Sequence, residues 1–217
     1  MSTVINIIKD NLEYFKNITI ENSIGRSLKQ IKLKDVNDAD RIIQDMDKIS
    51  QYFMAPNTKE LEWRLKSVDS MLLKLDKYKR LENNSNNYYR LSSCLNDLVG
   101  FRIKSNDNKN EVLNEVGNQK TFRIVNLLEG KQIDDGYRAI HLYLEIGGLY
   151  YPVEIQIWFE EDYEYNFWMH KYAYKILDNK QLKELFENYK NGKINSEKDF
   201  VDYVNTIKNN DLIFGWI

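Results

Sequence analysis

The sequence predicts an α+β fold, in which a mixed, mostly antiparallel sheet of about four to five strands is flanked by N- and C-terminal helices. Apolar residues recur at intervals of three and four towards both ends of the chain, and at intervals of two in the middle. The 217 residues are 42% hydrophobic with only 9 Gly and 2 Pro, a composition that excludes collagen-like and wholly disordered chains.

The N-terminal part is predicted to be helical from Val4 to about Phe53. The apolar positions that set this period are Ile8, Leu12, Phe15, Ile42, Met46, Ile49 and Phe53. Pro56 then interrupts the pattern, because proline disfavours the α conformation in the residue before it. A second helix is expected from about Lys59 to Arg80, followed by a polar loop over 83–87.

Four segments with a period of two are predicted to be strands. They are Asp97–Lys104, Thr121–Leu128, Tyr137–Ile146 and Tyr150–Trp158. After Glu160 the apolar spacing is helical again, with a break expected at Asn191-Gly192.

A chain of this length is expected to form a single domain over 1–217, with an N-terminal helical region (1–55), a core (56–176) and C-terminal helices (177–217). The lone cysteine, Cys94, excludes an internal disulfide, and two histidines are too few for a structural zinc site. No apolar run approaches the roughly 20 residues of a membrane-spanning helix, so we expect a cytoplasmic protein without a membrane partner.

The net charge of −2 predicts no general attraction to nucleic acid, so DNA is not an expected partner and any polyanion site must be local. Lys66, Ser70 and Lys74 stand four residues apart, which places two ammonium groups and a hydroxyl on one stripe of a helix. This stripe suits the successive phosphates of a nucleoside triphosphate. A solvated basic helix face is the alternative.

The last two predicted strands form a hairpin if Gly147-Gly148 is a two-residue turn, and His141 then faces Glu154. Side-chain alternation places a polar set on one face of the sheet and mostly apolar residues on the other. The polar set consists of Tyr137, Ala139, His141, Tyr143, Glu154, Gln156 and Trp158. A polar outer face with no function is the alternative.

Two carboxylates from distant segments, Asp97 and Glu154, could together hold one magnesium ion. Mg2+ binds few protein oxygens and leaves its other positions to water and phosphate. For each carboxylate alone, a solvated surface acid is the alternative.

Five motifs, in this order and spacing, resemble the synthetase domain of RelA/SpoT-type alarmone synthetases. They are R-x-K-x-x-x-S-x-x-x-K at Arg64–Lys74, D-L-V-G-F-R at Asp97–Arg102, G-Y-R-A-I-H at Gly136–His141, V-E-I-Q-I at Val153–Ile157 and H-x-x-x-Y-K at His170–Lys175. The resemblance covers about Glu60 to Lys175 and makes 56–176 the synthetase core. It implies a nucleotidyltransferase-like synthetase fold and a Mg2+-dependent transfer of pyrophosphate from ATP to the 3'-hydroxyl of an acceptor nucleotide, with release of AMP.

The resemblance also implies roles at the donor site. Arg64 and Arg102 would sandwich the adenine of ATP, since a guanidinium group stacks on flat rings. Lys66, Ser70 and Lys74 would hold the phosphates. The catalytic carboxylates Asp97 and Glu154 would position Mg2+, and Glu154 would help to deprotonate the attacking hydroxyl.

At the acceptor site, the resemblance implies that Tyr137 stacks on the acceptor base. Arg138, His141 and Gln156 would complete this site. Three departures from the family pattern fall here: Trp158-Phe159 replaces the usual Arg-Thr, Tyr163 replaces a short polar residue, and the usual lysine-rich segment is the net acidic Glu129–Asp135. The donor site therefore matches the family, whereas the acceptor site is altered.

Two acceptors are consistent with the resemblance, namely the 3'-CCA end of tRNA and the guanosine nucleotides GDP or GTP. We favour tRNA, as in toxic stand-alone members that are paired with an antitoxin protein, because an aromatic pocket can stack adenine or cytosine. Candidate tRNA-binding residues are Arg26, Lys29, Lys32, Lys34, Lys171 and Lys175. A solvated helix face is the alternative for this basic cluster.

Two functions of other classes are alternatives to a pyrophosphokinase. One is a catalytically inactive nucleotide-binding regulatory module, and another is a nucleotidyltransferase that releases pyrophosphate in place of AMP. The only two histidines, His141 and His170, lie within synthetase motifs. Alarmone hydrolysis, which needs a histidine-aspartate metal site, is therefore not expected.

Overall fold

The computed structural model describes residues 1–18, 39–52, 61–84, 89, 91–147 and 150–214. Its helices are α1 (Thr3–Asp10), α2 (Leu12–Asn17), α3 (Ala39–Tyr52), α4 (Val68–Asn83), α5 (Leu91–Cys94), α6 (Lys109–Gly117), α7 (Glu160–Trp168), α8 (Asn179–Lys190) and α9 (Glu197–Phe214), with the π-helical segment η2 (Met169–Ala173) after α7. Its strands are β1 (Leu61–Leu65), β2 (Val99–Ser105), β3 (Phe122–Asn126), β4 (Ile140–Leu144) and β5 (Val153–Phe159).

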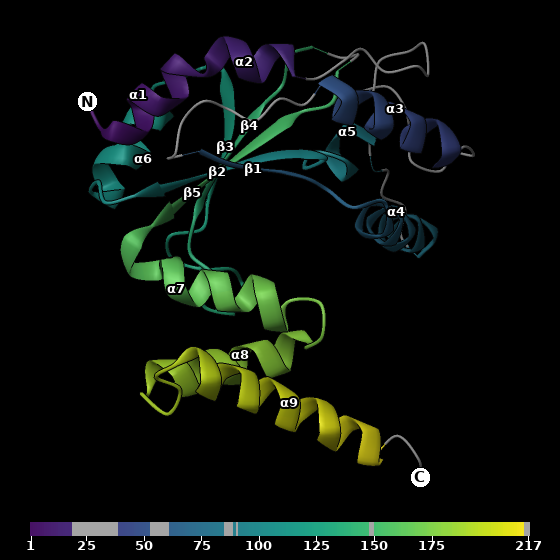
Figure 1. The fold of residues 1–217 in the computed structure, drawn as a ribbon, viewed down its shortest axis with the longest axis vertical. Helices are drawn as coiled ribbons and strands as arrows, with labels where there is room; N and C mark the ends of the chain where they lie inside the picture. Colours follow the sequence, from purple (N-terminus) through teal and green to yellow (C-terminus); the bar gives the residue numbers. More distant parts are fainter. Residues whose placement is uncertain (19–38, 53–60, 85–88, 90, 148–149, 215–217) are drawn as a thin grey trace. The chain divides into compact units, whose positions relative to one another are not determined.

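The strands form one five-stranded sheet in the order β1-β2-β5-β4-β3 (Figure 1). β1 pairs antiparallel with β2, in a register that sets Arg64 opposite Gly100 and Glu62 opposite Arg102. The predicted α+β class, with a mixed sheet flanked by helices, is confirmed.

Contacts divide the chain into two compact units that interleave along the sequence. The first unit comprises Met1–Val125 and His141–Ile157, and the second comprises Asn126–Ile140 and Trp158–Ile217. The predicted single domain, with divisions near 55 and 176, stays a prediction.

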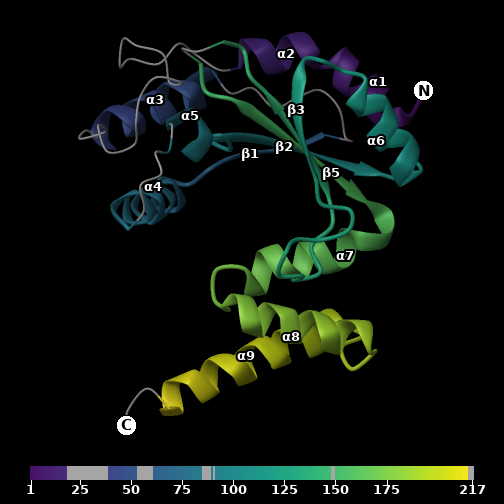
Figure 2. The same cartoon turned by 180° about the vertical axis from the view of Figure 1, so that it is seen from behind.

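In the first unit, the apolar face of the sheet is covered by N-terminal helices. Phe15 of α2 packs on Phe101 of β2 with ring centroids 4.7 Å apart, and Figures 1 and 2 show α1 and α2 along the same side of the sheet. The β5 residues Val153, Ile155 and Ile157 are fully buried. Burial of one face leaves the alternate residues of the same strands for polar chemistry.

The helix predicted from Lys59 to Arg80 is wrong at its start. Leu61–Leu65 is a strand, and α4 begins only at Val68, with Ser67 as its N-cap. The spacing of Leu61, Leu65 and Val68 also suits a helix, but hydrogen bonding to β2 selects the extended form. Part of the predicted segment, 59–60, lies outside the described residues.

The four predicted strands are confirmed as β2, β3, β4 and β5 with shorter or shifted ends. Helix α6 was not predicted, although its signals are an Asn108 cap and apolar residues at Val112 and Val116. Residues 148–149 lie outside the described part of the chain, so the two-residue turn stays a prediction.

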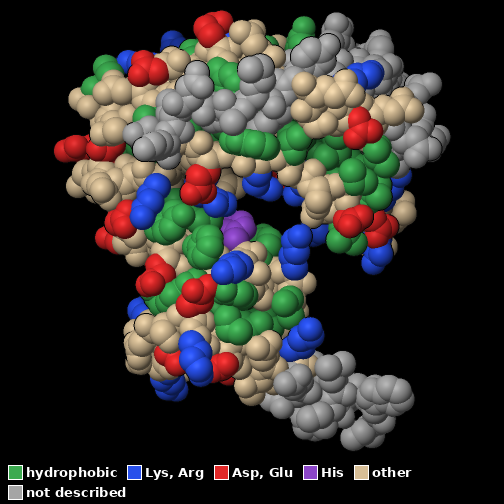
Figure 3. Space-filling view, in the orientation of Figure 1, with side chains coloured by type: hydrophobic (Ala, Val, Ile, Leu, Met, Phe, Trp, Pro, Cys, Tyr) green, Lys and Arg blue, Asp and Glu red, His purple; other side chains and the backbone are tan. Residues whose placement is uncertain are grey.

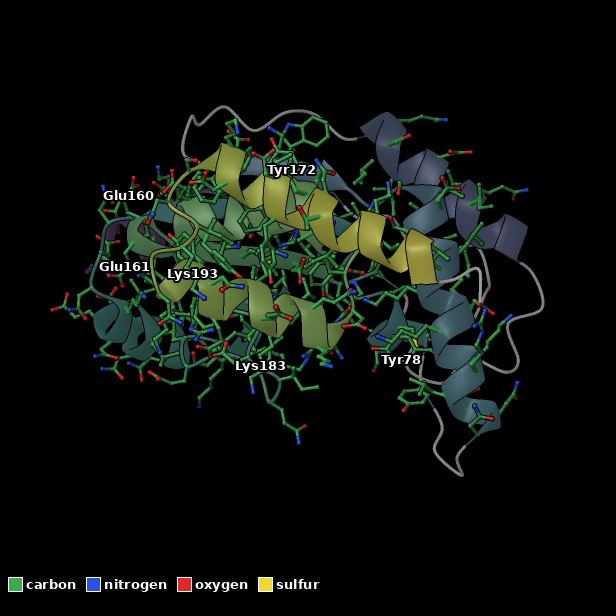
Figure 4. The ribbon with its side chains drawn as sticks, turned by 90° about the horizontal axis from the view of Figure 1, so that it is seen from below. Tyr78, Glu160, Glu161, Tyr172, Lys183 and Lys193 are labelled. Carbon is green, nitrogen blue, oxygen red and sulfur yellow. The ribbon has the colours of Figure 1, made fainter. Side chains whose placement is uncertain are left out.

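The second unit contains the C-terminal helices. Tyr165, Trp168, Leu185 and Phe200 are buried in its apolar core. Figure 4 shows α8 and α9 side by side, with the labelled Tyr172 next to α9, where its hydroxyl bonds to Glu197. The predicted break is confirmed, because α8 ends at Lys190 and Gly192 has a φ of +69°. In the described residues, no helix combines the length and the apolar character needed to cross a bilayer.

Candidate functional site

Asp97 lies two residues before β2 and accepts hydrogen bonds from two lysines. Lys66 Nζ is 2.9 Å from Oδ2, and Lys74 Nζ is 2.9 Å from Oδ1. Lys74 also donates to Asn96 Oδ1 at 2.9 Å. All three charged side chains are at most 21% exposed, so the ion pairs are only partly screened by water.

Lys66 and Lys74 both contact Asp97, but they do not lie on one helix as predicted. Lys66 precedes the helix, whereas Ser70 and Lys74 lie on α4. The Ser67 hydroxyl accepts a hydrogen bond from the Ser70 backbone at 3.3 Å and donates to the Ser70 hydroxyl at 2.8 Å. The Ser67 N-cap therefore fixes the start of α4, and with it the positions of Lys66 before the helix and Lys74 within it.

The second carboxylate, Glu154 on β5, has a side chain only 4% exposed and accepts from four side chains. His141 Nδ1 and Tyr143 Oη each lie 3.0 Å from Oε1, while Arg64 Nη2 and Gln156 Nε2 lie 3.2 Å and 2.9 Å from Oε2. The contact between His141 and Glu154 is the one predicted from the hairpin.

The charge of Glu154 is strongly stabilised. Burial acts to raise its pKa, but the hydrogen bond and charge of His141, the charge of Arg64 and the hydrogen bond from Tyr143 outweigh burial and lower the pKa to about 2. Glu154 is therefore an anion throughout the physiological range.

Tyr143 and Arg123 belong to this network but were not among the predicted site residues. The Arg123 guanidinium lies 4.1 Å from the centre of the Tyr143 ring. In the sequence, only the alternation of side chains along its strand points to Tyr143. No sequence pattern points to Arg123, because its partner is 20 residues away.

The two carboxylates belong to neighbouring parts of the sheet. Asp97 lies just before β2, Glu154 lies on β5, and these two strands are adjacent. The pKa of Tyr143 is raised by burial first, then by the charge of Glu154, with a further contribution from the charge of Asp97. Both negative charges therefore act to raise the pKa of the same hydroxyl.

A small open pocket lies beside this network. Its lining residues are Glu62, Trp63, Arg64, Gly100, Phe101, Arg102 and Gln156. Its lining combines two arginines, two aromatic residues and an amide, which suits a flat group that also offers polar edges. Arg102 also pairs with Glu62 at 3.2 Å.

Gly100 permits the close approach of Arg64 across the β1–β2 pair. A Cβ atom at this position would lie 3.2 Å from Arg64 Nε and 3.3 Å from Arg64 Cγ. Gly100, the glycine in D-L-V-G-F-R, therefore leaves room for Arg64 in the position from which it contacts Glu154.

The donor set of Asp97 and Glu154 fits Mg2+ by its chemistry, because carboxylate oxygens are the protein ligands that this cation takes. Among the residues that the structure describes, no group of three or more His, Cys, Asp or Glu side chains gathers as a metal centre. Asp97 and Glu154 would thus supply two ligands, and phosphate and water oxygens the others.

The second unit holds the remaining predicted residues. Tyr137 is only 5% exposed, and its hydroxyl accepts a hydrogen bond from Trp158 Nε1 at 3.0 Å. Lys131 Nζ lies 5.0 Å from the centre of its ring. Stacking of an acceptor base on this ring therefore requires Lys131 to move.

Arg138 forms a bidentate ion pair with Asp134, at 2.7 Å and 2.8 Å. Lys171 pairs with Glu197 at 3.0 Å, and Lys175 is exposed. The other candidate tRNA-binding residues, Arg26, Lys29, Lys32 and Lys34, lie outside the described residues. On the face seen in Figure 3, acidic side chains lie among basic ones.

On and beside the mixed sheet, two carboxylates pair with two lysines and an arginine, and these are groups of the kind that bind divalent cations and phosphates. Residues 63–178, which are 116 of the 217, match the family model described as the region found in RelA/SpoT proteins. The chain therefore belongs to the RelA/SpoT family, which confirms the resemblance. No curated protein sequence matches the chain.

Solved structures of small alarmone synthetases are similar to the chain. Small alarmone synthetase 1 of Bacillus subtilis bound to its product pppGpp is 20% identical over 84% of this chain and 90% of that one, with a TM-score of 0.36. A GTP pyrophosphokinase family protein from Streptococcus pneumoniae is 19% identical over 81% and 82%, with a TM-score of 0.37. Small alarmone synthetase 2 of B. subtilis is 19% identical over 82% and 95%, with a TM-score of 0.32.

Proposed function

We propose that the protein is a pyrophosphokinase of the small alarmone synthetase type, which transfers the β,γ-pyrophosphate of ATP to the 3'-hydroxyl of an acceptor nucleotide and releases AMP. One observation carries this proposal. Lys66 and Lys74 contact Asp97, and Arg64 contacts Glu154 from 90 positions away in the sequence. The cations expected at the donor nucleotide thus meet the carboxylates expected at the metal.

In this reaction the acceptor hydroxyl attacks the β-phosphorus, and the bond from that phosphorus to the oxygen of AMP breaks. Lys66 and Lys74 neutralise charge on the phosphates, and Arg64 holds the base, so that the reacting atoms stay in line. Magnesium held by Asp97 and Glu154 would neutralise further charge on the triphosphate.

Glu154 acts in this proposal by orienting groups more than by holding a proton. A carboxylate with a pKa near 2 accepts a proton poorly at neutral pH. Four side chains already bond to its carboxylate, so the attacking hydroxyl would be aligned by replacing one of these donors, and the hydroxyl proton passes to solvent.

For the acceptor we propose the 3'-CCA end of tRNA, with GDP or GTP as the alternative. The support is that Lys131 and Arg138, which lie on either side of Tyr137 in the sequence, are both in ion pairs. Lys131 pairs with Asp135 at 2.6 Å and Arg138 pairs with Asp134 at 2.7 Å, so this acidic segment neutralises its own cations. A guanosine polyphosphate gains little there, whereas an RNA 3' end carries no terminal polyphosphate.

Transfer of radiolabel from γ-labelled ATP, tested separately with GDP, GTP and deacylated tRNA, decides the acceptor. We expect labelled tRNA and free AMP, and no label on tRNA that lacks its 3'-terminal adenosine. Label in guanosine products alone would overturn the tRNA assignment. Release of pyrophosphate in place of AMP would overturn the reaction type.

Asp97→Asn and Glu154→Gln are expected to reduce transfer at least about 100-fold, because each removes a charge at the metal and phosphate site. Glu187→Gln, an exposed change on α8, is the matched control and should retain full activity. Nucleotide binding without transfer in the wild type would favour the regulatory-module alternative. An antitoxin partner stays a prediction.

A further inference from the structure

Gln156 lies in the pocket with an amide whose orientation is fixed. Its side chain projects from β5 and lines the pocket together with Arg64, Gly100 and Arg102. A carboxylate only accepts hydrogen bonds, so the NH2 group of the amide must face Glu154 Oε2, 2.9 Å away. The carbonyl oxygen, Oε1, is consequently turned away from Glu154.

This carbonyl oxygen is buried and has no hydrogen-bond partner among the described residues. Gln156 as a whole is only 5% exposed, so water has little access to the atom. A buried acceptor without a donor costs free energy, so this oxygen calls for a donor that the described residues do not supply. Gln156 lines the pocket, so a ligand bound there could supply this donor after a small shift of the side chains that cover the oxygen.

Two arginines set the shape of any group that fills the pocket. Arg64 and Arg102 line it from neighbouring strands, and guanidinium groups favour flat rings as partners. A flat ring that also offers an N–H donor at its edge is an amino-substituted nucleobase.

We propose that Gln156 Oε1 accepts a hydrogen bond from the exocyclic amino group of the adenine of ATP, and that Gln156 is thereby a specificity-determining residue of the donor site. This inference rests on the proposed function and moves Gln156 from the predicted acceptor site to the donor pocket. The lock between Gln156 Nε2 and Glu154 makes the selection rigid, because the amide cannot flip to donate to a keto group without placing its oxygen against a carboxylate.

Direct binding of nucleotides by calorimetry, with no acceptor present, tests the inference. The probes are ATP, purine riboside triphosphate, which lacks the amino group, and inosine triphosphate, which carries a keto group in its place. For the wild type we expect Kd to rise roughly 10-fold for the purine nucleotide and roughly 100-fold for the inosine nucleotide.

Gln156→Met removes the carbonyl oxygen and keeps the volume, and it should bring the three Kd values to within about threefold of one another. Tyr143→Phe is the matched control. It removes another donor to Glu154 but does not line the pocket, so it should keep the wild-type ratios even if its transfer rate falls.

Equal binding of the three nucleotides by the wild type would overturn the inference, and this measurement needs no variant to fold. Retention of the ratios in Gln156→Met would overturn it as well. If the wild type bound none of the triphosphates, the proposed function itself would fail. Selective binding of ATP without transfer to any acceptor would contradict the pyrophosphokinase and leave the role of Gln156 intact.

Discussion

At the scale of single residues, the charged groups of the site are held in place by hydrogen bonds within the protein. Glu154 is buried, ionised and bonded to four side chains from β1, β4 and β5. Removing a single donor leaves three, whereas removing the carboxylate leaves four donors in a buried site with no acceptor. Glu154 is thus the residue at which substitution acts on both stability and chemistry.

Glu154→Gln should flatten the dependence of stability on acid. A carboxylate whose pKa is lowered by folding stabilises the fold above its unfolded pKa, and this stabilisation is lost as the pH falls towards the folded value of about 2. The free energy of unfolding of the wild type should therefore fall between about pH 5 and pH 2 more steeply than that of the variant. Urea denaturation across this window measures the difference, and identical slopes would contradict it.

Gly100→Ala and Gly100→Val should weaken ATP binding in that order, because a side chain at this position presses on Arg64. The alanine Cβ needs a shift of only a few tenths of an ångström, so we expect about a threefold rise in Kd, and about 30-fold for valine. Thermal unfolding should change little, since both residues suit a strand better than glycine does. Unchanged Kd values for both variants would show that Arg64 does not bind the nucleotide.

At the residue scale, the sequence was informative wherever a motif or alternation applied. Asp97, Arg64 and Lys74 came from motif spacing, and the pairing of His141 with Glu154 came from hairpin arithmetic. The hydrogen bond from Tyr143 was not predicted, because alternation gives the face of a side chain but not its partner.

Among the elements, the start of α4 sets the positions of Ser70 and Lys74, two of the residues proposed to bind phosphate. Ser67→Ala removes the N-cap, and Asn108→Ala removes the corresponding cap of α6, where Asn108 accepts from the backbones of Asn110 and Glu111. Each should cost about 1 kcal/mol of stability in urea denaturation. Only Ser67→Ala should also weaken ATP binding, since Ser70 and Lys74 lie on α4. An equal effect of both variants on ATP binding would contradict this.

The same region explains which elements the sequence predicted poorly. The period of two was clear in β2 and β5, whose alternate residues are buried against α2 or in the core. In β1 the exposed edge strand carries little such alternation, with Trp63 45% exposed, and its pairing with β2 decided the structure.

For the molecule as a whole, the described residues proposed to bind ATP all lie in the first unit. Phe200→Ala in the second unit and Phe15→Ala in the first both delete a fully buried ring and should each cost roughly 3–5 kcal/mol. Under conditions where both variants remain folded, only Phe15→Ala should raise the Kd for ATP, because Phe15 supports Phe101 of the pocket. A matching loss of ATP binding in Phe200→Ala would contradict this division.

At this scale, length and composition predicted the class of fold but not its two interleaved units. The first unit leaves the chain at Val125 and resumes at His141, and the second resumes at Trp158 within β5. Such boundaries depend on contacts between distant segments, which no local pattern of apolar residues records.

The carboxylates of Asp97 and Glu154 come with their own counter-ions, because each of their four oxygens already accepts from a side chain of the protein. On entry of a metal–triphosphate complex, Asp97 would exchange two ammonium groups for the metal, and Lys66 and Lys74 would exchange a carboxylate for phosphate. The ion pairs within the protein would then be replaced by ion pairs with the metal and the phosphates, and the net charge of the site would change little. The triphosphate alone would leave Asp97 without a cation, and the metal alone would leave Lys66 and Lys74 without an anion. The triphosphate and its cation are therefore expected to bind together.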